Sequence, residues 1–318
     1  YGKSPKSYFL QNDGKGNFKE IPLPVDLANL GMVTDATWTD YNNDGWLDLI
    51  VVGEWMPITL IKNQNGLFTN SSLTTIKNTE GWWNCIITDD FDNDGDIDVM
   101  AGNVGLNTRL HASIEEPVRL YLKDFDGNGS LDQIMTYYLE GKEYPFATKD
   151  LLSKQMNFLK KKFTSYNSFS GTTMEKLLEP DQLKGALIKK ASEFRTLYFE
   201  NVGNDEFVAH DLPIETNFSS VMSITSRDID NDGKKDVILA GNFYDFNPGM
   251  GRQDASHGLL LLNAGNNTFK AVPYNISGIR IEGQVRNMDW ITSADGSINL
   301  VIAKNNERVE ILKLNSNL

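Results

Sequence analysis

Cysteine is almost absent from this chain of 318 residues, because Cys85 is the only one. A single cysteine excludes an internal disulfide framework and any zinc site built from paired cysteines. Cys85 lies in an apolar run, where a free cysteine commonly packs as a small hydrophobic side chain. We therefore expect a buried structural thiol rather than a reactive one.

Histidine, basic charge and long apolar runs are also scarce. The 3 histidines form no spaced cluster, and the sequence contains neither an H-E-x-x-H nor a G-x-S-x-G motif. The net charge is −13, and no basic face with interleaved aromatics is visible, which argues against a nucleic-acid partner. No apolar run approaches the roughly 18 residues of a transmembrane helix, and no signal peptide is recognisable.

Aspartate, by contrast, is concentrated in four nine-residue loops of the form D-x-[DN]-x-[DN]-G-x-x-D. They occupy residues 40–48, 90–98, 124–132 and 228–236. Side-chain oxygens at positions 1, 3, 5 and 9 of such a loop can converge on one point, joined by the backbone carbonyl of position 7. Because an all-oxygen set of this kind suits Ca²⁺, the sequence predicts about four Ca²⁺ ions, which would offset much of the negative charge.

These loops differ from EF-hands. An EF-hand requires a bidentate glutamate at position 12 and a helix on each side, whereas position 12 here is Val51, Ala101, Met135 or Leu239. An apolar, strand-like run follows each loop, which predicts that the loops are turns of β-hairpins. Clusters of Asp, Asn and Gly also form turns without metal, but four copies in one register favour a metal-binding motif.

A second pattern alternates with the first and consists of an apolar strand, Asn, a glycine turn, Phe and a short strand. It occurs at residues 10–18, 61–68, 199–207 and 262–269. Two alternating hairpins make a four-stranded unit of roughly 45 residues, which is a propeller blade. We therefore predict an all-β fold, a β-propeller of five or six four-stranded antiparallel blades. A fifth hairpin at residues 291–299 has lost its first carboxylate and should fold without metal.

Residues 147–195 interrupt the repeats with helical periodicity, and Pro180 suits a first helical turn. The prediction is one propeller domain with blades in residues 1–146 and 196–318 and a helical insertion at 147–195. The chain starts and stops inside a blade. We therefore expect it to be part of a longer surface protein, with the N-terminal hairpin closing the ring.

The motifs resemble the FG-GAP and VCBS repeats of integrin α-subunit-like β-propellers, over most of the chain outside the helical insertion. An apolar strand that ends in glycine after the loop, as at Gly53, Gly102 and Gly241, is typical of these repeats. Stretches such as residues 102–109 are similar to bacterial surface proteins related to cartilage acidic protein and associated with ASPIC/UnbV domains. The resemblance implies an extracellular, calcium-bound propeller used for adhesion or ligand binding.

The same resemblance assigns metal-ligand roles to the matching positions, with position 7 acting through its backbone carbonyl. The predicted ligands are Asp40, Asn42, Asp44, Trp46 and Asp48; Asp90, Asp92, Asp94, Asp96 and Asp98; Asp124, Asp126, Asn128, Ser130 and Asp132; and Asp228, Asp230, Asp232, Lys234 and Asp236.

Hairpin geometry predicts a second kind of site. The metal loops join the first and second strands of the blades and share one face, so the connections to the third strands lie on the opposite face. Those connections combine aromatic side chains with amides, carboxylates and arginines, which suit a glycan or an extracellular protein ligand. The predicted ligand-contacting residues are Glu54, Trp55, Asn103, Asn107, Arg109, Tyr244, Arg252, Asp254 and His257.

Two alternatives to this interpretation stay open. Tryptophans at this face could pack between blades, and Asn103 could bond turn backbone groups. The alternative function is a carbohydrate-active enzyme of the lyase type, in which Tyr244, Arg252, Asp254 and His257 supply a base, a clamp and an acid. A binding module is favoured, and it is expected outside the cell, on a bacterial outer surface or in the periplasm.

Overall fold

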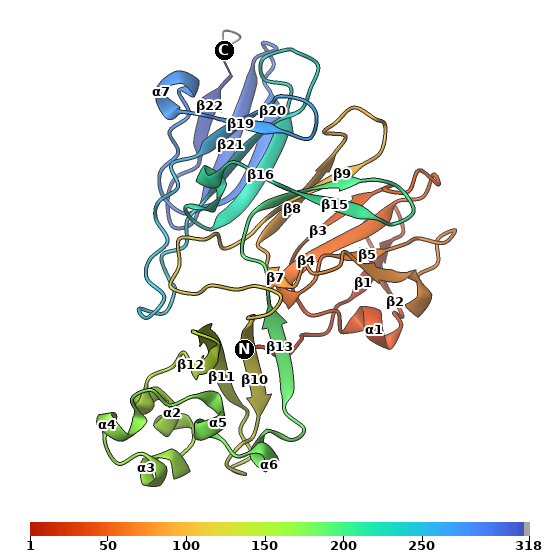
Figure 1. The fold of residues 1–318 in the computed structure, drawn as a ribbon. Helices are drawn as coiled ribbons and strands as arrows, with labels where there is room; N and C mark the ends of the chain where they lie inside the picture. The colour runs from red at the N-terminus through yellow and green to blue at the C-terminus, as the bar shows by residue number, and fades with distance from the viewer. Residues whose placement is uncertain (315–318) are drawn as a thin grey trace.

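A computed structural model of the chain describes residues 1–314. It is mostly β structure, arranged in several antiparallel sheets, and Figure 1 shows these sheets side by side with a helical region at one end. The expectation of an antiparallel β fold is therefore confirmed. A closed propeller ring is not shown by the described residues, so the count of five or six blades stays a prediction.

The first large sheet follows the expected order of hairpins. Its path is β3 (Met32–Thr39), β4 (Asp48–Met56), β5 (Thr59–Ile61) and β6 (Leu73–Thr75), and β7 (Gly81–Trp82) also pairs with β4. The 3-10 helix η1 (Asn70–Ser72) precedes β6. Before this sheet lie a separate hairpin, β1 (Phe9–Asn12) with β2 (Phe18–Ile21), and the short helix α1 (Val25–Ala28).

The second sheet is built from two distant parts of the chain. Its order is β8 (Cys85–Asp89), β9 (Asp98–Gly102), β14 (Leu197–Asn201) and β15 (Phe207–Asp211). The segment between β9 and β14 contains another sheet, in the order β12 (Lys142–Pro145), β11 (Asp132–Leu139), β10 (Val118–Lys123) and β13 (Leu187–Ala191). We call residues 118–191 the inserted unit, which Figure 1 shows apart from the other sheets.

The helices of the inserted unit lie between β12 and β13. They are α2 (Lys149–Gln155), α3 (Phe158–Lys162), α4 (Tyr166–Phe169), α5 (Met174–Leu177) and α6 (Pro180–Leu183). Their apolar side chains pack with Tyr121 and Ile134 of the sheet into a core that belongs to this unit. The loop 124–132 connects β10 with β11. The third aspartate loop therefore lies in the inserted sheet and not in the row of repeat sheets.

The last part of the chain returns to the repeat. The third sheet is β16 (Val221–Arg227), β17 (Asp236–Gly241), β18 (Leu259–Asn263) and β19 (Phe269–Val272), and the fourth is β20 (Val285–Thr292), β21 (Ile298–Lys304) and β22 (Glu310–Lys313). A 3-10 helix, η2 (Ile214–Asn217), precedes β16, and α7 (Tyr274–Ser277) follows β19.

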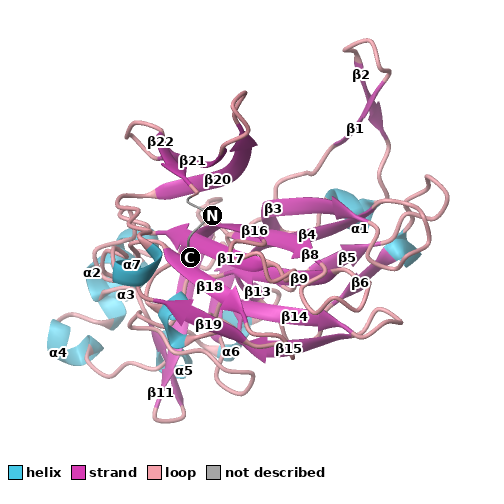
Figure 2. Cartoon of the chain, turned by 90° about the horizontal axis from the view of Figure 1, so that it is seen from above, coloured by secondary structure: helices cyan, strands magenta, loops and turns pink. Residues whose placement is uncertain are grey.

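The four repeat sheets pack in succession through their first strands, because β3 contacts β8, β8 contacts β16 and β16 contacts β20. A polar cavity of about 530 Å³ lies among these four strands. In the view of Figure 2 the β1–β2 hairpin and the sheet β20–β22 project separately at the two ends of the row.

Burial on both faces explains why the second strands of the repeats are continuous apolar runs in the sequence. On β4, Ile50 and Val52 enter one core cluster, while Val51 enters another on the opposite face. On β17, Val237 and Ile238 are likewise divided between two cores. Because these two strands are covered on both faces, both sets of their alternating side chains are apolar.

Candidate metal centres

The four aspartate loops share one backbone design. In each, the carboxylate of position 1 accepts a hydrogen bond from the N–H of the glycine at position 6, at 2.8 Å for Gly45 and Gly129 and at 3.1 Å for Gly95 and Gly233. The side chain at position 5 accepts from the N–H of position 7, for example from Trp46 to Asp44 at 2.9 Å. These bonds fold each loop around its own side-chain oxygens.

Two positions in each loop adopt left-handed backbone conformations. Position 6 is always glycine, with φ between 84° and 95°. Position 4 also has positive φ, and it is Asn43, Asn93, Gly127 or Asn231. Asn and Gly tolerate this region better than other residues, which accounts for their place at position 4.

The aspartate at position 9 is buried at the base of each loop, and Asp48, Asp98 and Asp236 have no exposed surface. In three loops its Oδ2 accepts the N–H of position 2: Phe91 donates to Asp98, Phe125 to Asp132, and Ile229 to Asp236. Burial disfavours the ionised form, so it raises the pKa of all four of these carboxyls, and that of Asp98 to about 6. A cation would relieve this cost.

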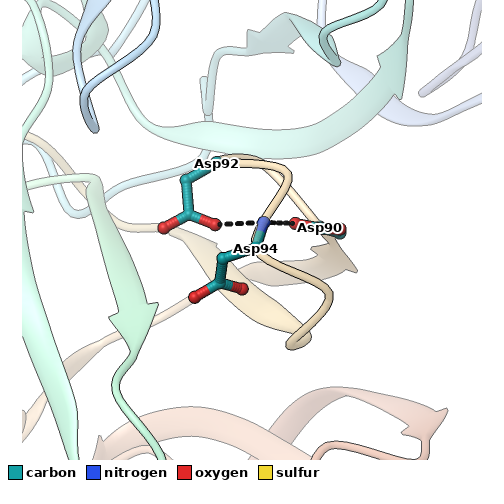
Figure 3. Close-up of side chains that lie close together, drawn as sticks. All are labelled: Asp90, Asp92 and Asp94. Carbon is teal, nitrogen blue, oxygen red and sulfur yellow. Dashed lines mark hydrogen bonds between the residues drawn. The ribbon is translucent and has the colours of Figure 1, made fainter.

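Carboxylates converge in three of the loops. Their oxygens lie within 4.8 Å of one another in the groups Asp90, Asp92 and Asp94; Asp124, Asp126 and Asp132; and Asp228, Asp230 and Asp236. Figure 3 shows the first group gathered around the backbone nitrogen of Asp94. Loop 40–48 is not among the groups found in the described residues. Three of the four predicted sites thus bring their carboxylates together.

Two buried oxygens test whether a metal fits these loops. Among the described residues, Oδ2 of Asp48 and Oδ1 of Asp228 are buried without a hydrogen-bond partner. A buried carboxylate oxygen that lacks a partner is costly, and a bound Ca²⁺ would satisfy it. The donor set fits the ion at 228–236, and at 40–48 the unpartnered Oδ2 of Asp48 is open to it, although the carboxylates of that loop form no such group. At 228–236, however, Asp232 pairs with the ammonium group of Lys234 instead of joining the other carboxylates.

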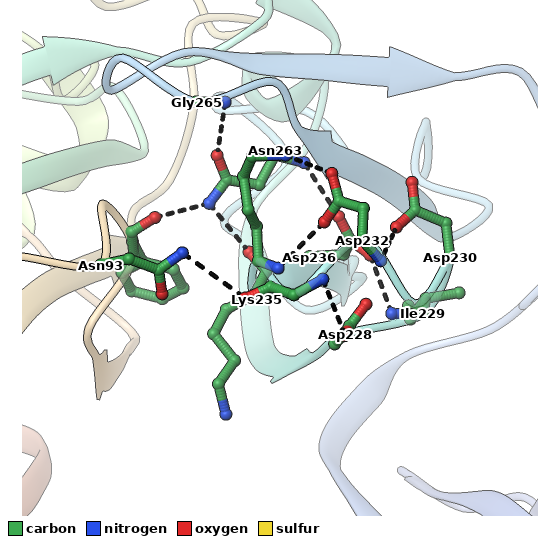
Figure 4. Close-up of polar contacts among 12 residues, drawn as sticks. Asn93, Asp228, Ile229, Asp230, Asp232, Lys235, Asp236, Asn263 and Gly265 are labelled. Carbon is green, nitrogen blue, oxygen red and sulfur yellow. Dashed lines mark hydrogen bonds and ion pairs between the residues drawn. The ribbon is translucent and has the colours of Figure 1, made fainter.

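An asparagine outside the loops holds three of them in place, those of the repeat sheets. Asn63 lies just after β5, whereas Asn201 and Asn263 end β14 and β18. Their backbone N–H groups donate to Oδ1 of Asp48, Asp98 and Asp236 at 2.7–2.9 Å. Figure 4 shows Asn263 between Gly265 and Asp236. Sequence reasoning missed this role, although the repeated Asn of the second hairpin pattern was the signal for it.

The predicted ligand-contacting residues divide into buried and exposed groups. Trp55 is 5% exposed, packs edge-on against Trp82 at 5.0 Å between ring centroids, and donates its Nε1–H to Tyr1. Glu54 accepts a hydrogen bond from the same tyrosine hydroxyl. Asn103 is fully buried and donates to the carbonyl of Glu193 at 3.0 Å. Trp55 and Trp82 share a core cluster with β10 residues, so they join the inserted unit to the repeat sheets.

The exposed group comes from two loops that touch each other. Arg109 donates to the carbonyl of Gly249 at 2.8 Å, and the side chain of Gln253 donates to the carbonyl of Asn107 at 2.9 Å. These bonds tie the connection after β9 to the long connection between β17 and β18. The structure therefore brings these two predicted contact regions together.

Within the long connection, three predicted residues lie together. The guanidinium of Arg252 stacks 3.7 Å from the ring centroid of Tyr244, and its Nε lies 3.2 Å from a carboxylate oxygen of Asp254. His257 is also exposed on this connection. Near its other end, a cleft of about 430 Å³ separates Asn247 from the inserted unit, where Met135, Phe146 and Leu151 line it.

Comparison with known proteins addresses the repeat itself. Residues 40–101 match the family model described as FG-GAP-like repeat. That range contains two of the aspartate loops and the hairpin between them. Comparison with curated proteins gives no match.

Comparison with solved structures finds a similarity to the V. cholerae biofilm matrix protein Bap1, at 11% sequence identity and a TM-score of 0.32. The alignment covers 95% of this chain and 66% of that protein.

In the described residues no helix could cross a membrane, and the longest, α2, has 7 residues.

Proposed function

We propose that this chain is an extracellular binding module whose repeat sheets are stabilised by Ca²⁺ in its four aspartate loops. The observation that carries the proposal is the pair of buried, unpartnered carboxylate oxygens on Asp48 and Asp228 inside loops that offer only oxygen ligands. The FG-GAP-like match over residues 40–101 supports the same assignment. The propeller architecture is part of this proposal.

The residues of each loop contribute in different ways. Side chains at positions 1, 3, 5 and 9, and the carbonyl of position 7, would hold the ion. The glycine N–H at position 6 keeps the first carboxylate turned inward, and the buried aspartate at position 9 anchors the loop to the sheet. When bound, Ca²⁺ would neutralise carboxylates that otherwise repel one another at the end of each hairpin.

Ligand binding is proposed for the opposite face. Its members are the exposed Asn107, Arg109, Arg252, Asp254 and His257 and the half-buried Tyr244, whereas the burial of Trp55 and Asn103 leaves those two as packing residues. The cleft beside Phe146 has a volume within the range of small-ligand sites, about 300–1,000 Å³. Its apolar wall beside polar and charged side chains suits a glycan or a protein segment.

Metal analysis tests the first half of this proposal. The protein should retain close to four Ca²⁺ ions per chain after dialysis against buffer with millimolar Ca²⁺, and should lose them in EGTA. A variant with Asp48→Asn and Asp228→Asn should lose two. Protein that binds no Ca²⁺ at millimolar concentration would refute the assignment.

A further inference from the structure

The aspartate loops of neighbouring repeat sheets are joined by hydrogen bonds that no single hairpin requires. Between loops 40–48 and 90–98 the bridge is Asn201. Its backbone N–H donates to Oδ1 of Asp98 at 2.8 Å, and its Nδ2 donates to the carbonyl of Tyr41 at 2.8 Å. Asn201 is 3% exposed. One buried residue therefore contacts position 2 of one loop and position 9 of the next.

Asn263 repeats the arrangement one sheet further on. It donates from its backbone to Oδ1 of Asp236 at 2.9 Å, and from Nδ2 to the carbonyl of Phe91 at 2.6 Å. Phe91 is position 2 of loop 90–98, as Tyr41 is of loop 40–48. Figure 4 shows this contact region, with Asn93 reaching toward the loop of the next sheet. The same geometry at two successive junctions marks a repeated structural device.

A second set of contacts joins the loops directly. The side chain of Asn43 donates to a carboxylate oxygen of Asp96 at 2.7 Å, and that of Asn93 donates to the carbonyl of Gly233 at 3.4 Å. Both donors are at position 4, and both acceptors belong to the next loop in the row. Asn231 occupies position 4 of the last loop, and its side chain has no hydrogen bond to another described residue.

Loop 124–132 makes no such link to another loop within the described part of the chain. It belongs to the inserted sheet, and its base contacts the inserted unit's own helix through the side chain of Gln155, which accepts the N–H of Gln133 at 3.1 Å. Asp132 accepts the N–H of Phe125, within the same loop. This loop therefore serves as an internal control for Ca²⁺ binding without contacts between loops.

We propose that loops 40–48, 90–98 and 228–236 bind Ca²⁺ as a coupled row, with Asn201 and Asn263 as the positioning residues that link them, while loop 124–132 binds independently. The inference rests on the proposed calcium function. An ion bound in one loop holds the position 2 carbonyl of that loop in place. This carbonyl accepts a hydrogen bond from Asn201 or Asn263, and the same asparagine orients the position 9 carboxylate of the next loop. Ordering one site thus lowers the cost of ordering its neighbour, which is positive coupling.

Site-resolved Ca²⁺ titration of the ¹⁵N-labelled chain tests this inference. Each loop has one position 6 glycine, so the amide signals of Gly45, Gly95, Gly129 and Gly233 report the four loops separately. Asp92→Ala should disable loop 90–98. The Ca²⁺ concentration that half-shifts Gly45 and Gly233 should then rise about fivefold or more, the usual lower range of coupling between sites, while Gly129 is unchanged.

A second variant covers the case in which Asp92→Ala does not fold. Asn43→Gly keeps the left-handed backbone and removes the exposed contact to Asp96. It should weaken Ca²⁺ binding at Gly45 and Gly95 by the same factor, about twofold, because coupling between two sites is reciprocal. Asn231→Gly makes the same substitution at a position without an inter-loop contact. The Ca²⁺ concentrations that half-shift the Gly45 and Gly95 signals should therefore stay unchanged.

The outcomes separate the two proposals. If Gly45 and Gly233 titrate in Asp92→Ala as in the natural chain, the loops bind Ca²⁺ independently and the coupling is wrong, although the calcium function stands. If none of the four glycine signals responds to Ca²⁺ in the natural chain, the calcium function itself fails.

Discussion

The asparagines at or just after the ends of the third strands offer a graded test of what holds the repeat sheets together. Asn263→Ala keeps the backbone N–H but removes three side-chain hydrogen bonds, to the carbonyls of Phe91 and Lys235 and from the N–H of Gly265. At roughly 1 kcal/mol each, with the partners left in a buried site, the expected loss is about 3 kcal/mol of the free energy of unfolding.

Two equivalent residues supply matched controls. Asn63→Ala loses two such bonds, to the carbonyl of Leu47 and from the N–H of Gly66, at a more exposed site, so about 1 kcal/mol is expected. Asn12 lies on the β1–β2 hairpin, is exposed, and accepts only the N–H of Gly14 among the described residues. Asn12→Ala should cost on the order of 0.5 kcal/mol.

Urea unfolding at saturating Ca²⁺, followed by tryptophan fluorescence, measures all three variants. The loss in the free energy of unfolding should be smallest for Asn12→Ala, intermediate for Asn63→Ala and largest for Asn263→Ala. Equal losses for Asn263→Ala and Asn12→Ala would show that these buried side-chain hydrogen bonds contribute little, and the reasoning would be refuted.

Three further predictions follow from individual contacts. Lys234→Met frees the Asp232 carboxylate from its ion pair. Because surface ion pairs are weak, the Ca²⁺ affinity of that loop should rise only about two- to fivefold, as measured by the amide shift of Gly233. An unchanged affinity would contradict this prediction. Cys85 is buried and burial raises its thiol pKa, so a thiol reagent should label it only after unfolding in EGTA, and fast labelling of the native protein would count against a closed core. Trp55→Ala should destabilise the fold by about 3–5 kcal/mol. By contrast, Arg252→Ala should leave the melting temperature unchanged and weaken binding to a glycan or protein ligand by about 1–3 kcal/mol. If Arg252→Ala instead unfolds the protein and Trp55→Ala only weakens binding, Arg252 is the packing residue and Trp55 the ligand contact.

The sequence predicted the hairpins well because their signals are local. The aspartate loops, the Asn and Gly turns and the continuous apolar second strands all appear in the structure as antiparallel hairpins. Each of these signals depends on a few neighbouring residues, such as the glycine at position 6 with its positive φ.

Long-range pairing was not readable in the same way. Loop 124–132 has the same motif as the others, yet its strands pair with β12 and β13 in the inserted unit. The missing Asn and Gly hairpin between loops 90–98 and 124–132 was the available signal. The strands β9 and β14 pair across the whole inserted unit, a contact that no local pattern specifies.

The ligand face shows a similar limit. Trp55 looks like a binding residue in sequence because it lies in a polar connection between strands. In the structure the inserted unit packs against it, and Trp55 shares a core with Leu120 and Phe194. Sequence alone could not show which surface the inserted unit covers, whereas the exposed Arg252 beside Tyr244 matches the expectation of a surface arginine.

The calcium dependence of thermal unfolding tests the central claim most directly. With a Kd of about 10⁻⁴ M per site and ~1 mM Ca²⁺, each loop contributes about 1.4 kcal/mol, and four contribute roughly 5.5 kcal/mol. The melting temperature in millimolar Ca²⁺ should therefore exceed that in EGTA by on the order of 10 °C. Identical melting curves in Ca²⁺ and in EGTA would contradict the account.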